Sequence, residues 1–318
     1  MFYIVSDDNG ACVYSDQVRR VTFGGETFGV LDFTPVEQDG RYHIHMGDYR
    51  TEMFLITDAI CDEAAWKVLN FLFCERCGYP VPGRHGLCHM DMMAKHKGRQ
   101  LSFCGGWHDA GDLSQQVIHT AETVDALYRL ADTVKEKDIV FYKRLMEEAA
   151  WGLEFVLRTR FGDGYRGTSA GLVRWTNGIL GDGDDIEARV HNHAFENLMC
   201  SAICSRAALA LEAEDPELAF RCREAAAEDF RFGMERYLEK GMELPIIWEH
   251  TYQSSGSQYA AVIVLAAAAL YASAKQESYR DTAWEYVQYL LACPFIFLQE
   301  IIPQESGSWR WESIICPL

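Results

Sequence analysis

The chain has 318 residues, of which 49% are apolar and 24% charged, the composition of an ordered globular protein. Its net charge of -18 opposes phosphate backbones and anionic lipid surfaces, so we expect neither nucleic acid nor a membrane as a partner. We find no run approaching the ~20 apolar residues of a membrane span. Eleven dispersed cysteines indicate reduced, buried thiols. With no signal peptide visible at the start, they favour a cytoplasmic location.

The first 57 residues predict a small β domain. Candidate strands at residues 21–23, 28–33 and 42–46 are separated by Gly-Gly and Asp-Gly turns. An immunoglobulin-type sandwich needs ~100 residues. We therefore interpret residues 1–57 as part of such a sandwich, its trailing half.

Residues 58–318 predict a mainly α domain. The alternation of apolar residues expected for strands gives way here to the period expected for a helix. This helical period first appears in an apolar stripe that includes Val68, Leu69 and Leu72. The expected helices cover residues 60–75, 113–133, 141–158, 191–213, 216–237, 256–275 and 278–292. Short connections between successive helices favour helical hairpins in series. The stretch after Cys293 is apolar without helical caps, and we expect the helical domain to be incomplete at its C-terminal end.

Two aspartates lie in a glycine-rich string, Gly-Gly-Trp-His-Asp-Ala-Gly-Asp, at residues 105–112. Asp109 and Asp112 are three residues apart, so both carboxylates can face one cavity if a helix follows. Asp112 and Gln115 have the spacing of a capping box, which predicts Asp112 at a helix N-terminus. The helix dipole there favours an ionised carboxylate, as a general base requires. Alternatively, Asp112 is only a cap and Asp109 only a turn residue.

This string resembles the signature of glycoside hydrolase family 9 at all eight positions. The resemblance implies a toroid of α-helical hairpins, often preceded by an immunoglobulin-like domain, and inverting hydrolysis of β-1,4-glucosidic bonds in cellulose or related β-glucans. It makes Asp112 the general base and has Asp109 help to hold the attacking water. The glycines suit a backbone folded tightly against a sugar ring.

The general acid of the family is a glutamic acid within an Asn-Glu pair, toward the C-terminal end of the toroid. Glu300, Glu305 and Glu312 lack those neighbours, so we assign the acid to none of them. Turnover by the chain is therefore in question. Two alternatives stay open: a non-catalytic carbohydrate-binding fragment, and a hydrolase of another β-linked oligosaccharide, such as mixed-linkage glucan or glucosamine oligomers.

Cys77, Cys88, His89 and His108 are the candidate metal ligands. Two thiolates and two imidazoles suit tetrahedral zinc with no position left for water, although their spacing is not that of a zinc finger. Some family 9 enzymes with the immunoglobulin-like domain bind zinc through a Cys, a Cys-His pair and the His before the first Asp, and all four positions match here. We expect a structural zinc. Buried thiols without metal, or a catalytic zinc with an open position, are the alternatives.

Several neighbours and loop residues are weaker candidates. Cys74, Cys104, His85 and His96 lie near the four candidate ligands and could be confused with them. Aromatic residues in or near loops could stack on pyranose rings, or could pack in the core instead. They are Trp107, Trp175, Trp248 and Tyr252. An acidic group could bind calcium or could form a solvated loop. It comprises Asp182, Asp184, Asp185 and Glu187.

Overall fold

The computed structural model describes residues 1–109, 113–243 and 256–292. The chain divides into two compact units, Met1–Phe71 and Leu72–Leu318. This division falls inside helix α1 (Asp62–Cys74). The domain boundary expected after residue 57 stays a prediction.

The first unit is built of short β-strands, as the sequence predicts. Its five-stranded sheet has the order β2-β1-β5-β6, with β7 also paired to β5, and β3 and β4 form a separate hairpin. The strands are β1 (Phe2–Ser6), β2 (Cys12–Asp16), β3 (Arg19–Phe23), β4 (Glu26–Val30), β5 (Gly40–Met46), β6 (Tyr49–Arg50) and β7 (Phe54–Ile56). Side chains alternate between the two faces of a strand. Phe2 and Ile4 of β1 and Tyr42 of β5 form one small buried core.

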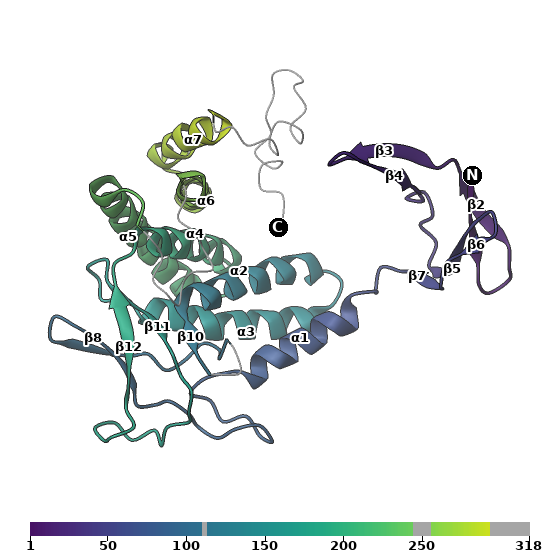
Figure 1. Ribbon diagram of the computed structural model, residues 1–318. Coiled ribbons are helices and arrows are strands. Elements are labelled where there is room, and N and C mark those ends of the chain that lie inside the picture. The colour runs from purple at the N-terminus through teal and green to yellow at the C-terminus, as the bar shows by residue number, and fades with distance from the viewer. Residues whose placement is uncertain (110–112, 244–255, 293–318) are drawn as a thin grey trace. The chain divides into compact units, whose positions relative to one another are not determined.

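The second unit contains three helical hairpins in series, and the predicted fold class is confirmed (Figure 1). They are α2 (Val117–Val134) with α3 (Ile139–Arg158), α4 (Ala194–Leu211) with α5 (Pro216–Lys240), and α6 (Gly256–Ala274) with α7 (Glu277–Ala292). Helix α4 packs against both α2 and α6, so these three form a row. Asp138 and Asp215 cap α3 and α5 through their carboxylates, and these caps fix the short turns within two of the hairpins.

The start of α2 differs from the prediction. The helix begins at Val117, because Gln115 and Gln116 form strand β10 and pair with Ala170 and Ser169 of β11 (Arg166–Ala170). Gln115 therefore lies in the sheet and not in the first turn of the helix, whose N-cap residue is Gln116. Gln115 instead donates its side-chain amide to the carbonyl of Gly105.

A five-stranded sheet in the second unit was not expected from the helical pattern. Its order is β10-β11-β12-β8-β9, and Figure 1 shows it beside the helices of this unit. The remaining strands are β8 (Met92–His96), β9 (Arg99–Ser102) and β12 (Ile186–His191). Because β12 takes up the residues through His191, α4 begins at Ala194 rather than at residue 191.

Helix α6 is long and apolar enough to cross a membrane by length and composition, contrary to the expectation that no run approaches this limit. Its 19 residues have a mean hydropathy of 1.5 in the most apolar window, and 44% of that window is buried. Within the second unit the helix packs against α4, α5 and α7. A core helix of a globular protein has the same composition, so the expectation of no membrane partner stays a prediction.

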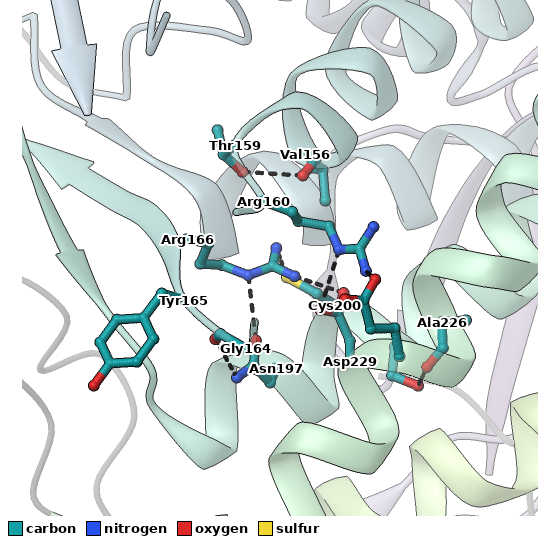
Figure 2. A network of polar contacts seen from close by, with 12 residues as sticks. Val156, Thr159, Arg160, Gly164, Tyr165, Arg166, Asn197, Cys200, Ala226 and Asp229 are labelled. Carbon is teal, nitrogen blue, oxygen red and sulfur yellow. Dashed lines mark hydrogen bonds and ion pairs between the residues drawn. The ribbon is translucent and has the colours of Figure 1, made fainter. Parts of the chain in front are cut away.

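A buried ionic network joins β11 to α4 and α5 (Figure 2). The fully buried guanidinium of Arg166 lies 2.5 Å from Asp229 Oδ2 and 3.0 Å from the Cys200 sulfur. Arg160 also contacts Asp229, through its Nε atom at 3.3 Å. Burial disfavours the charge of Arg166, but Asp229, Cys200 and Glu196 together outweigh this effect and raise the pKa of the guanidinium.

We predict that Asp229→Asn lowers the free energy of unfolding by about 3–5 kcal/mol, because it leaves a buried guanidinium without its counter-charge. Glu235→Gln on the same helix is the control, since Glu235 forms an exposed pair with Arg231 and is expected to matter by less than about 0.5 kcal/mol. Urea denaturation measures both. Equal effects of the two substitutions would show that the network does not hold the unit together.

Candidate metal centre and aspartate loop

Cys77, Cys88, His89 and His108 come together in one buried cluster that could hold a metal ion. Their ligand atoms all lie within 4.8 Å of one another. The Cys77 sulfur is 3.5 Å from His89 Nδ1, and the Cys88 sulfur is 3.7 Å from His108 Nε2. Tetrahedral zinc with bonds of ~2.3 Å to sulfur and ~2.0–2.1 Å to nitrogen separates such atoms by about 3.6 Å. These two sulfur–nitrogen distances therefore match those of a tetrahedral site.

Backbone pairing brings the ligands from three segments together. Arg76 and Trp107 form an antiparallel bridge, so Cys77 and His108 lie diagonally across it, with their side chains on the same face. The backbone of Cys77 donates to the Gly106 carbonyl and that of His108 to the Glu75 carbonyl.

Cys88 and His89 come from a separate turn. His89 has a φ of 52°, a conformation that L residues rarely adopt. An extended chain directs consecutive side chains to opposite sides, whereas this turn lets both residues face the cluster.

Carbonyl groups around the cluster orient the two imidazoles. His89 Nε2 lies 3.3 Å from the Arg174 carbonyl, and His108 Nδ1 lies 3.1 Å from the Leu113 carbonyl. A neutral ring that donates to a carbonyl through one nitrogen presents the lone pair of the other. The nitrogens left over, His89 Nδ1 and His108 Nε2, are the ones that face the sulfurs.

The cluster already favours a thiolate. Hydrogen bonds with Cys77, His108 and His89 and from the backbone N–H of Gly78 lower the pKa of the Cys88 thiol to about 2, against the effect of burial. Burial instead raises the pKa of Cys77, which acts as the donor. A metal cation would replace that proton and favour both thiolates.

One carboxylate on α3 holds two of the three segments that carry the cluster residues. Glu148 is 1% exposed and accepts two hydrogen bonds from Arg76, at 3.1 and 2.7 Å. It also accepts the indole N–H of Trp107 at 2.7 Å. Arg76 and Trp107 directly precede Cys77 and His108. Because Glu148 binds both of these neighbours, it fixes the positions of two of the four cluster residues. The apolar pattern that predicts α3 did not indicate a role for Glu148.

Gly105 and Gly106 bring the loop close to helix α3. Gly105 and Gly106 have positive φ angles, and a Cβ on either would collide with α3, at Arg158 and Phe155 respectively. The backbone therefore comes close to a helix at these two positions, and its approach to a sugar ring stays a prediction. Arg158 also donates to the Cys104 carbonyl at 2.7 Å, which ties the loop to α3.

Asp109 has two hydrogen-bonding partners among the described residues, Ser114 and His119. Its backbone N–H donates to the Ser114 carbonyl at 2.9 Å, and its carboxylate lies 3.4 Å from His119 Nδ1. The sequence gave no reason to assign a role to His119 in this contact. Asp112 lies outside the described residues, and its role as general base stays a prediction.

The predicted sugar-stacking residues fall in different places. Trp107 is 5% exposed, and its ring fills the space above Gly152 of α3, a placement that favours the core-packing alternative. Trp175 is half exposed and stacks on His85 and His89 at centroid distances of 5.4 and 5.5 Å. Its indole thus covers the Cys–His cluster. Trp248 and Tyr252 lie outside the described residues.

The other nearby candidates have partners of their own. Both ring nitrogens of His85 contact backbone carbonyls, and His96 binds Asp163 at 3.0 Å. Cys74 is half-buried and outside the cluster. Cys104 is buried next to the cluster but is not one of its four members.

The acidic loop contains a second group that could hold a cation. Asp91 joins Asp184 and Asp185 there, with ligand atoms within 4.8 Å of one another. Asp91 already accepts hydrogen bonds from Thr176 and Gly178, and so organises the turn that precedes the acidic loop. Two members of the predicted set are engaged elsewhere, Asp182 with Asn177 and Glu187 with Lys95. Calcium at this loop stays a prediction.

A pocket of about 420 Å³ opens between α2, α4 and α6. Charged side chains from α2 and α4 line it, among them Asp125 and Arg206, whose side chains form an ion pair at 2.7 Å. Burial raises the pKa of Asp125 despite that pair. The predicted site residues in the described part of the chain do not line this pocket.

Comparison with known proteins defines the class as a glycoside hydrolase. The family Glycosyl hydrolase family 9 matches residues 62–313, which is most of the chain. The chain therefore belongs to glycosyl hydrolase family 9.

Individual relatives are distant. Endoglucanase D of Acetivibrio thermocellus is 25% identical over 152 residues, which are 43% of this chain and 24% of the relative. A metagenome-derived family 9 endoglucanase has a similar fold, with a TM-score of 0.63, 22% identity, and coverage of 91% of this chain and 57% of that one. A Zn-binding triple mutant of the family 9 endoglucanase J30 gives a TM-score of 0.64, 20% identity and coverage of 92% and 60%. The chain thus spans about a quarter of the curated relative and somewhat more than half of the solved structures.

We predict that Glu148→Gln lowers the free energy of unfolding by about 3 kcal/mol, because a buried Arg76 loses its main counter-charge. Glu154→Gln on the same helix is the matched control, since it changes an exposed pair with Arg221 and should cost no more than about 1 kcal/mol. Thermal and urea unfolding of the two variants measure the difference. If Glu148→Gln were as mild as the control, the carboxylate would not be the anchor of the loop.

Proposed function

We propose that the chain acts on β-1,4-linked glucans, hydrolysing glucosidic bonds with inversion. The proposal is supported chiefly by the family signature on a loop whose base, at His108 and Asp109, is fixed by backbone and side-chain hydrogen bonds. Endoglucanases among its relatives support the same substrate class.

In the proposed mechanism Asp112 is the general base and Asp109 positions the attacking water. Inversion requires that a water molecule fit between the base and an acid ~6.5–9.5 Å away on the other side of the sugar. His119 contacts the Asp109 carboxylate, and this contact would limit the directions in which that carboxylate can accept a hydrogen from water. The acid itself is not assigned.

We also propose that Cys77, Cys88, His89 and His108 hold a structural zinc ion. The distances between their ligand atoms, the carbonyls behind both imidazoles and the buried position support four protein ligands. A closed site leaves no position for a water molecule, so the ion would contribute folding free energy rather than a nucleophile.

Zinc removal should therefore lower stability. We predict about one zinc per chain and a lower melting temperature after chelation. Binding should also weaken as pH falls, because protons compete for the thiolates and imidazoles. Cys88→Ser should lose the metal and Cys61→Ser, an exposed cysteine, should retain it. Metal analysis and thermal melts measure this. Undiminished zinc in Cys88→Ser would contradict the assignment.

Activity is tested by reducing-sugar release from soluble β-glucan and cellulose, with Asp112→Asn as the control. We expect release by the unaltered chain and a loss of ~100-fold or more in the variant, the usual effect of removing a general base. Oligosaccharide binding without release by either protein would contradict the proposal and support a carbohydrate-binding role. Equal release by both would exclude Asp112 as the base.

A further inference from the structure

The pocket between α2, α4 and α6 has a lining that suits a small ligand. Its volume of about 420 Å³ lies within the range of small-molecule sites, which is roughly 300–1,000 Å³. Aliphatic side chains from all three helices form one part of its wall. They are Ala126 of α2, Met199 and Ile203 of α4, and Leu265 of α6. Ligand sites usually combine such a wall with a small number of polar groups.

The polar groups of this pocket are charged, and their charges balance. Glu122 and Asp125 supply two carboxylates, and Arg129 and Arg206 supply two guanidinium groups. Asp125 and Arg206 pair through two contacts, 2.7 Å from Nε to Oδ1 and 2.8 Å from Nη2 to Oδ2. An ion that entered the pocket would meet a charge of its own sign for each opposite one. The lining therefore favours a ligand without net charge.

The same groups can form hydrogen bonds with hydroxyls. Pairing with Asp125 through Nε and Nη2 leaves the other N–H donors of Arg206 available, and a carboxylate has more lone pairs than one partner uses. A hydroxyl both donates and accepts, so it can bond with either kind of group. A pyranose sugar has hydroxyls around its edge and C–H groups on its faces. It would therefore match the charged and the aliphatic parts of the lining together.

The pocket lies along the face of α2 that carries His119. His119, Glu122 and Ala126 have i, i+3 and i+7 spacing, so their side chains lie on one side of the helix. Ala126 is about 10 Å from His119 along the axis, at ~1.5 Å per residue. His119 Nδ1 in turn lies 3.4 Å from the Asp109 carboxylate. A ligand in the pocket would thus lie close to the residue that contacts Asp109.

We propose that this pocket is an accessory sugar site, which binds a short β-linked glucose oligomer of about the size of a disaccharide. The proposal rests on the substrate class proposed above and adds a second place where such a sugar is held. The lining of the pocket includes no aromatic side chain, so binding here depends on hydrogen bonds and aliphatic contact rather than on ring stacking. We therefore expect weak binding, measurable at millimolar sugar.

The test follows the methyl group of Met199 by NMR in the full chain with isotope-labelled methionine. The chain carries Asp112→Asn, so that the added sugar is not hydrolysed, and the loss of one signal in Met199→Leu assigns the resonance. We expect cellobiose to shift the Met199 signal until it saturates, because this side chain lines the pocket. The signal of Met46, an exposed residue of β5 in the first unit, should not move.

A matched pair of substitutions tests the pocket itself. Ala126→Phe should weaken cellobiose binding at least tenfold, because the added ring occupies the space of the ligand. Ala126 is exposed on α2, so the change does not disturb the core. Ala64→Phe introduces the same ring at an exposed position of α1 that does not line the pocket, and it should bind cellobiose like the parent chain. Melting temperatures show that both variants are folded.

The outcomes separate this proposal from the proposed hydrolysis. A Met199 signal that stays in place at high millimolar cellobiose would overturn the sugar site, even if the unaltered chain releases reducing sugar. Equal binding by the two phenylalanine variants would also overturn it, as would a larger Met199 shift with inorganic phosphate, which would indicate an anion site. A saturable Met199 shift that Ala126→Phe removes would support the site, even if the unaltered chain releases no sugar and the proposed hydrolysis is wrong.

Discussion

The buried carboxylate of Glu148 is the contact on which the candidate site depends. It binds Arg76 and the Trp107 indole, which adjoin two of the four cluster residues, and it does so from the middle of α3. Isolated buried charges are costly, so this carboxylate holds its partners in one arrangement. The ligands Cys77 and His108 are thereby placed by helix packing before any metal binds.

The Cys–His cluster and Asp109 share this scaffold. His108 supplies a cluster nitrogen, and the next residue is Asp109, so any change at the cluster reaches the aspartate loop through one peptide bond. The carbonyl of Leu113 holds the His108 ring, and the carbonyl of Ser114 holds the Asp109 backbone. A closed metal site in this position would stabilise the loop but would take no part in the hydrolysis of the glucosidic bond. That reaction would be carried out by the carboxylates.

Much of the helical architecture could be predicted from the sequence, because apolar periodicity and aspartate caps such as Asp138 are local signals. The sheet in the second unit could not, since β10 has two residues and its partner β11 lies some fifty residues later. The predicted start of α2, at residue 113, was wrong because Gln115 and Gln116 pair with this distant strand. The ligand set came from a family resemblance, whereas Glu148 acquires its meaning only from neighbours distant in sequence.

X-ray absorption at the zinc edge of the metal-loaded chain tests the central claim most directly. A closed site held by Cys77, Cys88, His89 and His108 predicts two sulfurs at ~2.3 Å and two nitrogens at ~2.0–2.1 Å around the ion. Three sulfurs would place Cys104 in the site, and an oxygen in place of a nitrogen would indicate an open position. Either result would contradict a structural centre built on these four residues.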